Sequence, residues 1–372
     1  MPRLLVILLL LHVYIGTRIV PDLPLGTAGR VVSLVALALL FTLMPLAFVA
    51  RRVERQPLAD RIALASFIAM GVFSSLLVLT LLRDLSLVAP FPGTYRTYSA
   101  AAVPILAALV TVVGFFNARR RARVRRVDIP IADLPPTLQG FTIAQISDVH
   151  VGPTIKRDYV EAIVEAVNEL RPDLIAVTGD LVDGPVSQLS RHTEPFGRLT
   201  APHGVYVVTG NHEYYSGARA WIEELRRLGL RVLLNEHVVV RHGGQQIVVA
   251  GVTDYSAGRF DAAQRSDPAA AIAGAPADAA VKVLLAHQPR SAFAAASAGY
   301  DLQLSGHTHG GQFFPWNLFV RLQQPFTAGL HRLGDLLIYI SRGTGYWGPP
   351  KRLWAPSEIT RLRLVHASGS ES

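Results

Sequence analysis

Long apolar blocks occupy the first third of the chain, and each of the three longest is uncharged over the roughly 20 residues that an α-helix needs to cross hydrocarbon. The first block is shorter and contains His12 and Arg18, but a long side chain near a helix end can reach the headgroups. A cleaved signal peptide is the alternative for this block, although no small-x-small cleavage site follows it. The pattern predicts an all-α transmembrane region over residues 1–118 with about four helices, at about 4–20, 31–50, 62–82 and 98–116.

Beyond this region the pattern changes to short β-branched runs that alternate with charged, periodic segments. Residues 141–147 (FTIAQIS) predict a buried strand, and 159–170 (YVEAIVEAVNEL) predict an amphipathic helix with its apolar residues on one stripe. A second helix is expected at 219–228, and 261–280 is either a short helix or a surface loop. Further strands are predicted at 174–178, 205–209, 246–252, 281–286, 302–305, 336–340 and 359–364. This alternation favours an α/β domain with ligand groups at the strand ends.

The composition of the 372-residue chain agrees with a membrane segment and excludes several classes of protein. Half of the residues are hydrophobic and 17% are charged, and the mean hydropathy of +0.32 is high for a soluble enzyme. There is no cysteine. The absence of cysteine excludes disulfide scaffolds, thiol catalysis and thiolate zinc sites.

The net charge of +9 is concentrated near the apolar blocks. Residues 1–116 carry +5, the arginines of 119–126 add +6, and the remainder carries −2. We interpret 119–127 as a basic juxtamembrane linker that contacts anionic lipid. A nucleic-acid-binding segment would have aromatic residues among its arginines, and this segment has none. The slightly acidic C-terminal part argues against DNA or RNA as a partner.

The arginines also predict the orientation of the chain. With four spans, eleven arginines lie on the side of the N-terminus and of the C-terminal domain, against four on the other side. The positive-inside rule therefore predicts a cytoplasmic C-terminal domain. An odd number of spans would reverse this assignment.

Short polar ligand groups follow five of the predicted strands. They are Asp148-Val149-His150, Gly179-Asp180, Gly210-Asn211-His212-Glu213, His287 and Gly306-His307-Thr308-His309. Each alone is a common turn or capping group, but an open α/β sheet gathers its ligand site at successive strand ends. Imidazole and carboxylate donors together favour borderline divalent ions such as Mn, Fe, Co, Ni or Zn over Mg. The neighbouring glycines are expected to let the backbone turn sharply there.

This series of motifs, D-x-H, GD, GNH[E], H and GHTH, resembles the calcineurin-like metallophosphoesterase superfamily over residues 141–310. The tail motifs at 310–312, 341–345 and 350–352, with the multi-span N-terminus, are similar to membrane-associated bacterial phosphodiesterases. The resemblance implies a four-layer α/β/β/α sandwich over 128–366, followed by a disordered tail at 367–372. It also implies a multi-pass protein of the bacterial inner membrane.

The resemblance further implies a site with two divalent metal ions, manganese favoured. One ion would be held by Asp148, His150 and His309, the other by Asn211, His287 and His307, with Asp180 between the two. His212 would be the general acid or oxyanion stabiliser, and Glu213 would orient His212 or cap the following helix. Two ions about 3.5–4 Å apart would lower the pKa of a bridging water, so that a hydroxide attacks phosphorus in line.

Other polar residues near the motifs have simpler interpretations. For Asp183, Asp254 and Arg290, a role in a turn or an ion pair is as plausible as a role in the reaction. A contact of Arg342 or Arg352 with a substrate phosphate has little support. Residues 313–333 carry many aromatic residues, which fit either a packed loop or a membrane-facing lip.

The substrate is expected to be a phosphodiester or a pyrophosphate, lipid-linked because the chain is tethered in a bilayer. The alternatives are UDP-2,3-diacylglucosamine hydrolysis in lipid A synthesis and general nucleotide phosphodiester hydrolysis. A binding module without chemistry is less plausible, because such relatives normally lose ligands and this chain keeps the full set. No nucleic-acid partner is predicted.

Overall fold

The computed structural model describes residues 2–50, 52–53 and 55–367. These residues form two compact units, of which one comprises Met1–Arg119 with Gly348–Leu353 and the other Arg120–Trp347 with Trp354–Ser372. Of the tail predicted to be disordered at 367–372, all but Ala367 lies outside the described residues. The two units are described separately below.

The first unit is helical. Its helices are α1 (Pro2–Ile19), α2 (Thr27–Leu43), α3 (Leu46–Ala50), α4 (Gln56–Ser86) and α5 (Gly93–Arg119). Four stretches, Arg3–Asp22, Thr27–Ala50, Gln56–Ser86 and Gly93–Arg119, are long and apolar enough to cross a membrane. Large apolar side chains such as Val32 and Ile105 point outward with two thirds of their surface exposed. Such a surface is stable where lipid covers it, so the predicted all-α transmembrane region of about four helices is confirmed.

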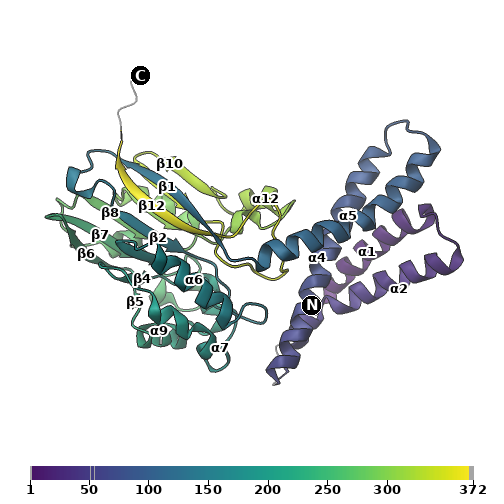
Figure 1. Ribbon diagram of the computed structural model, residues 1–372, viewed down its shortest axis with the longest axis horizontal. Helices are drawn as coiled ribbons and strands as arrows, with labels where there is room; N and C mark the ends of the chain where they lie inside the picture. Colours follow the sequence, from purple (N-terminus) through teal and green to yellow (C-terminus); the bar gives the residue numbers. More distant parts are fainter. Residues whose placement is uncertain (1, 51, 54, 368–372) are drawn as a thin grey trace. The chain divides into compact units, whose positions relative to one another are not determined.

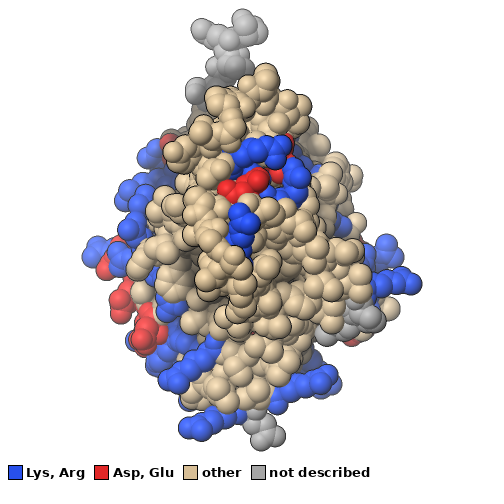
Figure 2. All heavy atoms as spheres, turned by 90° about the vertical axis from the view of Figure 1, so that its right-hand side faces the viewer, with Lys and Arg blue, Asp and Glu red and all other residues tan. Residues whose placement is uncertain are grey.

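Charged side chains of this unit pair with one another at the helix ends. Nη2 of Arg83 contacts Oδ2 of Asp22, and Nε of Arg18 lies 2.8 Å from Oδ2 of Asp84. Figure 2 shows acidic and basic side chains gathered within a broad surface of uncharged residues. Ion pairing lowers the cost of placing these groups beside hydrocarbon.

The segment Gly348–Leu353 packs with these helices, although its sequence gives no sign of it. Nζ of Lys351 donates to the carbonyl oxygen of Gly71 at 3.0 Å and to Oγ of Ser75. The backbone N–H of Arg352 donates to the carbonyl oxygen of Gly114 at 2.9 Å. Small residues on α4 and α5 let the segment approach the helix backbones, as small residues do at helix interfaces in membranes.

The second unit contains two six-stranded sheets (Figure 1). The order of the first sheet is β1-β12-β2-β3-β4-β5 and that of the second is β10-β11-β9-β8-β7-β6. Strands β2 to β5 are parallel, as are β7, β8, β9 and β11. The strands are β1 (Arg123–Ile131), β2 (Thr142–Ile146), β3 (Leu174–Val177), β4 (Val205–Val207), β5 (Arg231–Val232), β6 (Glu236–His242), β7 (Gln245–Gly251), β8 (Val281–Leu285), β9 (Leu302–Ser305), β10 (Gly329–Leu333), β11 (Leu336–Ile340) and β12 (Glu358–His366).

One apolar core joins the two sheets face to face. It contains Ile143 and Leu174 from the first sheet and Val249, Val283 and Leu304 from the second, each at most 1% exposed. A further core lies between the second sheet and helices α10 and α11, and α6, α7 and α9 gather beside the first sheet in Figure 1. The helices of this unit are α6 (Arg157–Glu169), α7 (Val186–Thr193), α8 (Asn211–Ser216), α9 (Ala218–Arg227), α10 (Pro268–Ile272), α11 (Ala292–Ser297) and α12 (Trp316–Phe319). The predicted four-layer α/β/β/α sandwich is confirmed.

The structure adds strands where charge concealed the pattern. Arg123–Ile131, mostly within the segment interpreted as a linker, forms β1 and pairs in parallel with β12. Arg363 and Asp128 form an ion pair at 2.7 Å between these strands. Glu236–His242 forms β6, which pairs antiparallel with β7. Charged residues are mixed with apolar ones in β1, and polar residues bound three valines in β6. Such patterns fit a half-exposed strand as well as a polar loop.

Candidate metal centre

The seven predicted ligands follow the C-terminal ends of parallel strands. Asp148 and His150 follow β2, Asp180 follows β3, and Asn211 follows β4. His287 follows β8 of the second sheet, and the predicted ligands His307 and His309 follow β9. The two sheets therefore contribute to one site, which lies at the edge where their parallel strands end.

Asp148, His150 and His309 form the first group of potential metal ligands. The Nε2 atoms of His150 and His309 face each other at 3.1 Å, and Nε2 of His309 lies 3.5 Å from Oδ1 of Asp148. All three side chains are at most 10% exposed. Two imidazole nitrogens this close are stable only with a proton or a cation between them, so this arrangement suits a divalent ion.

Asp180, His287 and His307 form the second group. Nδ1 of His287 lies 2.7 Å from the carbonyl oxygen of Thr178 and must carry a hydrogen, which leaves Nε2 as the ligand atom. This Nε2 lies 3.1 Å from Oδ2 of Asp180 and 3.2 Å from Nδ1 of His307. The backbone carbonyl of Thr178 thus fixes the His287 ring with its free nitrogen toward Asp180 and His307.

Asp180 lies between the two groups. Its Oδ2 is 3.1 Å from Nε2 of His287 and 3.8 Å from Nε2 of His150, so one carboxylate reaches both sets of donors. Asn211 adds an amide oxygen, which is buried and has no hydrogen-bond partner among the described residues. A buried oxygen without a partner costs free energy unless something binds it. The donor set therefore fits a pair of divalent metal ions.

The backbone at these loops is strained. Asp148, His150, Asp180, His307 and His309 all have positive φ, between 50° and 69°. Left-handed backbone at a residue other than glycine costs about 1–3 kcal/mol and persists where the surroundings enforce it, most often at functional sites. The fold holds these five side chains in a fixed geometry that an unstrained loop would not adopt.

The glycines beside the ligands act mainly by making space. Gly179 has a positive φ of 88°, as expected for a sharp turn. At Gly210 and Gly306 the reason is different, because a Cβ would overlap the carboxylates of Asp180 and Asp148. The backbone N–H groups of the next loop then donate to these carboxylates, from His212 to Asp180 at 2.8 Å and from His307 to Asp148 at 2.9 Å.

His212 lies beside the two groups and is held by Asp183. Its Nε2 is 4.0 Å from Oδ2 of Asp180, and its Nδ1 is 2.6 Å from Oδ1 of Asp183. The same Asp183 oxygen lies 3.0 Å from Nδ1 of His150. Asp183 thus orients both a candidate ligand and the candidate acid, a role that the sequence left among turn and ion-pair residues.

Glu213 is part of the framework and holds two loops together. Its carboxylate accepts hydrogen bonds from the backbone N–H groups of Gly210 at 2.6 Å, Asp180 at 3.0 Å and Leu181 at 2.7 Å. Of its two expected roles, the structure supports capping of the helix that begins at Asn211. Burial, together with the Asp180 charge, raises the pKa of Glu213 to about 7.

The charges around the site act differently on its histidines. Burial lowers the pKa of His212, but the carboxylates of Asp180 and Asp183 outweigh burial and raise it to about 9. Burial and the nearby His287 lower the pKa of His307 to about 3. These shifts favour a proton on His212 and a free lone pair on His307.

The remaining polar residues near the motifs have structural partners. Asp254 accepts from Nε2 of Gln288 with both oxygens at 3.1 Å, and Nη2 of Arg290 donates to the carbonyl of Gln323. Nη1 of Arg342 lies 3.3 Å from Oε2 of Glu358. These contacts agree with turn and ion-pair roles.

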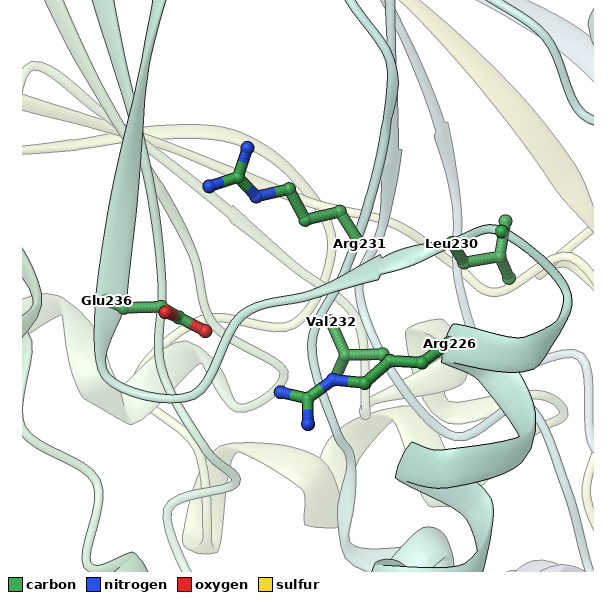
Figure 3. Close-up of a pocket in the computed structure, with 6 residues that line it drawn as sticks. Arg226, Leu230, Arg231, Val232 and Glu236 are labelled. Atoms are coloured by element: carbon green, nitrogen blue, oxygen red, sulfur yellow. The ribbon is translucent and has the colours of Figure 1, made fainter.

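A separate pocket of about 400 Å³ lies at the edge of the first sheet (Figure 3). It is lined by Arg226, Gly229, Leu230, Arg231, Val232 and Glu236. None of the predicted ligands lines it, so it is distinct from the candidate metal centre.

Comparison with known proteins shows what this arrangement resembles. Residues 141–311 match the family model described as calcineurin-like phosphoesterase. The chain is 38% identical to "Transmembrane protein with metallophosphoesterase domain" of Danio rerio over 71% of this chain and 62% of that protein. It is 39% identical to an uncharacterized metallophosphoesterase of Helicobacter pylori over 68% and 66% of the two chains. It is 34% identical to one of Aquifex aeolicus, over 65% of this chain and 91% of that protein. The chain thus spans slightly under two thirds of the zebrafish relative.

Proposed function

The chain belongs to the calcineurin-like metallophosphoesterase family, and on this premise we propose that it is a membrane-anchored phosphoester hydrolase. It hydrolyses a phosphodiester or pyrophosphate bond with the help of two divalent ions. The substrate is lipid-linked. The resemblance found in the sequence is confirmed by the family model and by relatives that are 38% and 39% identical.

One observation carries the proposal, namely the convergence of both candidate ligand groups on Asp180. Its carboxylate lies within 4.0 Å of nitrogens from His150, His212 and His287. A carboxylate shared by two sets of donors is the arrangement that two-metal hydrolysis needs. The partnerless oxygen of Asn211 adds a donor to the second set. The seven proposed ligands are Asp148, His150, Asp180, Asn211, His287, His307 and His309.

The bound ions would supply the Lewis acidity that activates an attacking water and stabilises the phosphoryl charge. The chain's own contribution is the placement of a proton donor. Nε2 of His212 faces the centre, while Asp183 holds Nδ1 and so fixes the ring orientation. We assign His212 as the group that protonates the departing oxygen or stabilises the phosphoryl oxygens. Manganese is the favoured ion, because imidazole and carboxylate ligands are mixed at both positions.

The helix unit supports a lipid-linked substrate. Four helices long and apolar enough to cross a membrane precede the catalytic fold, and we place the protein in the bacterial inner membrane with its catalytic unit in the cytoplasm. In the segment 313–333, Phe314, Trp316, Leu318, Phe319 and Leu322 are each at least 38% exposed, whereas Phe313 is buried. Exposed aromatic and aliphatic side chains of this kind suit the headgroup layer.

Hydrolysis by the detergent-purified full chain, loaded with Mn²⁺, tests the proposal. A panel of a lipid-linked pyrophosphate such as UDP-2,3-diacylglucosamine, a nucleotide diester, bis(4-nitrophenyl) phosphate and a phosphomonoester separates the substrate classes. We expect diester or pyrophosphate hydrolysis that a chelator abolishes and Mn²⁺ restores. Hydrolysis of soluble monoesters alone would refute the lipid-linked assignment, and hydrolysis of nucleotide diesters alone would favour a general nucleotide phosphodiesterase.

The role of His212 needs a separate variant. His212→Ala should lose most turnover and still bind two metal ions per chain, because we propose that the ions bind the other two groups. His212 could form a further group with His150 and Asp183, but we assign its ring as the proton donor. His192→Ala, a change at a histidine in α7 outside both ligand groups, is the matched control. Loss of bound metal from His212→Ala would refute the assignment.

A further inference from the structure

Two exposed aromatic rings contact the proposed acid, His212. The ring centroid of Tyr215 is 5.2 Å from that of His212, with an interplanar angle of 70°. The centroid of Trp347 is 5.6 Å from His212, at 73°. Tyr215 is 64% and Trp347 53% exposed. Large aromatic side chains next to a catalytic group and open to solvent have surface available for a ligand.

A third ring extends this surface. Phe260 lies 5.7 Å from Tyr215 and is 52% exposed, and its other neighbour, Tyr214, is buried. Trp347 and Tyr215 therefore contact His212, and Phe260 extends the surface from Tyr215. We refer to these three residues as the aromatic platform.

The framework of the metal centre fixes the platform. Tyr215 lies on α8, the short helix that also carries Asn211 and His212. The backbone of Trp347 is held by Gln312, whose Oε1 accepts from the Trp347 N–H at 2.9 Å and whose Nε2 donates to the Trp347 carbonyl at 3.0 Å. Gln312 itself donates its backbone N–H to the carbonyl of His309 at 3.0 Å. The backbones that carry Tyr215 and Trp347 are thus tied to the segments that carry the proposed ligands, which favours a preorganised subsite.

The position of His212 determines which part of a substrate would meet these rings. A general acid contacts the oxygen of the leaving group, so the leaving group passes beside the His212 ring and against its neighbours. Flat, rigid rings with exposed surface bind planar rings by stacking and edge contacts. This step rests on the proposed function, because it takes His212 as the acid.

We propose that Trp347, Tyr215 and Phe260 form a specificity subsite that binds a planar ring on the leaving group of the substrate. A nucleobase is the common biological group with this chemistry. In this arrangement the planar ring belongs to the part of the substrate that departs from the scissile phosphate. The lipid-linked part is then attached to the same phosphate on its opposite side.

A binding experiment tests the subsite without relying on turnover. Isothermal titration of the full chain, detergent-purified and Mn²⁺-loaded, with uridine 5′-monophosphate and with ribose 5-phosphate compares ligands that differ only in the base. We expect the nucleotide to bind about 10-fold more tightly, as one to two aromatic contacts allow. The preference should fall to about 2-fold or less in Trp347→Ala and in Tyr215→Ala, and return in Trp347→Phe. Phe293→Ala, which removes an exposed ring from α11, is the control that should keep it.

Several outcomes overturn the subsite. Equal affinity for the two ligands in the unmodified chain does so, as does a preference that survives both alanine variants. Tighter binding of dodecyl phosphate than of the nucleotide, lost in Trp347→Ala, would assign the rings to an acyl chain instead. Turnover of bis(4-nitrophenyl) phosphate, measured in parallel, reports on the proposed function alone. Absence of turnover across the whole substrate panel, beside an intact base preference, would refute the hydrolase and leave the platform as a base-binding surface only.

Discussion

One oxygen of Asp183 lies 2.6 Å from Nδ1 of His212, and this carboxylate oxygen also faces Nδ1 of His150 at 3.0 Å. A single acceptor thus sets the orientation of both rings and places a hydrogen on the nitrogen of each that points away from the centre. Partners of this kind stabilise ligand geometry and raise the basicity of the ligand.

The first prediction concerns this carboxylate. Asp183→Ala should lower kcat by about 10–100-fold, because both rings lose the acceptor that orients them. Asp183→Asn, which can keep an oxygen in place but not the charge, should lie between Ala and the unmodified chain. Kinetics with a chromogenic diester and metal analysis measure the effect. Asp158→Asn, on the exposed start of α6, should change neither, and an unaltered kcat in Asp183→Ala would contradict the orienting role.

A second prediction separates Glu213 from the chemistry. Glu213→Ala leaves the buried N–H groups of Gly210, Asp180 and Leu181 without their acceptor. We expect this to lower the free energy of unfolding by about 2–4 kcal/mol. Thermal unfolding in detergent measures the loss. Glu223→Ala breaks only an exposed pair with Arg219 and should leave the melting temperature nearly unchanged. Equal melting temperatures for the two variants would contradict the framework role.

The proposed ligands could be selected from the sequence because each follows a short buried strand. Asp148, Asp180 and Asn211 come directly after β-branched runs, and parallel strands end at the same edge of a sheet. The place of Asp183 could not be predicted in this way. It depends on a bridge between Val151 and Val182, which joins two loops about thirty residues apart and brings Asp183 beside His150.

Two further features depend on contacts that local pattern does not encode. Strand β1 carries Arg123, Arg125 and Arg126, so its charge suggested a linker, and only its pairing with β12 at the far end of the chain makes it a strand. Lys351 packs among α4 and α5 through Gly71 and Ser75. The apolar residues near Lys351 are interrupted by Gly, Pro and Arg, so the local sequence does not predict burial among apolar helices.

A third prediction uses the close approach at Gly210. In Gly210→Ala the new methyl group would overlap the Asp180 carboxylate, which must then move away from both ligand groups. Metal affinity, measured by competition with a chelator, should fall by at least about 10-fold, in the range found when the partners of ligands are removed. Gly229→Ala carries the cost of a positive φ of 84° but meets no atom within 4 Å. Loss of metal from both variants would show a general instability and contradict the steric explanation.

A fourth prediction tests the orientation in the membrane. The chain has no cysteine, so a single introduced thiol reports its own exposure to a membrane-impermeant maleimide. Pro90→Cys, in the exposed loop between α4 and α5, should react in intact cells, and Ser297→Cys, at the exposed end of α11, only after lysis. The reverse result would place the catalytic unit outside the cytoplasm.

The last prediction concerns the ion pairs of the helix unit, where burial decides the magnitude. Arg83 has 2% of its side chain exposed, and besides Asp22 its guanidinium donates to the carbonyls of Arg18 and Arg96. Arg83→Ala leaves the carboxylate of Asp22, which is 26% exposed, without its partner, and it leaves the carbonyls of Arg18 and Arg96 without a donor. The change should cost about 3 kcal/mol, the lower end for a buried pair, because only the Arg83 side is fully buried.

Arg18, which is 46% exposed and pairs with Asp84, provides the contrast within the same unit. Its replacement by Ala should cost no more than about 1 kcal/mol. The double variant Arg83→Met with Asp22→Asn should recover part of the loss, because it removes the uncompensated charge together with its partner. Thermal unfolding in one detergent measures the stability of the unmodified chain, the two alanine variants and the double variant. Similar small shifts for Arg83→Ala and Arg18→Ala would mean that the buried network does not hold α1, α4 and α5 together.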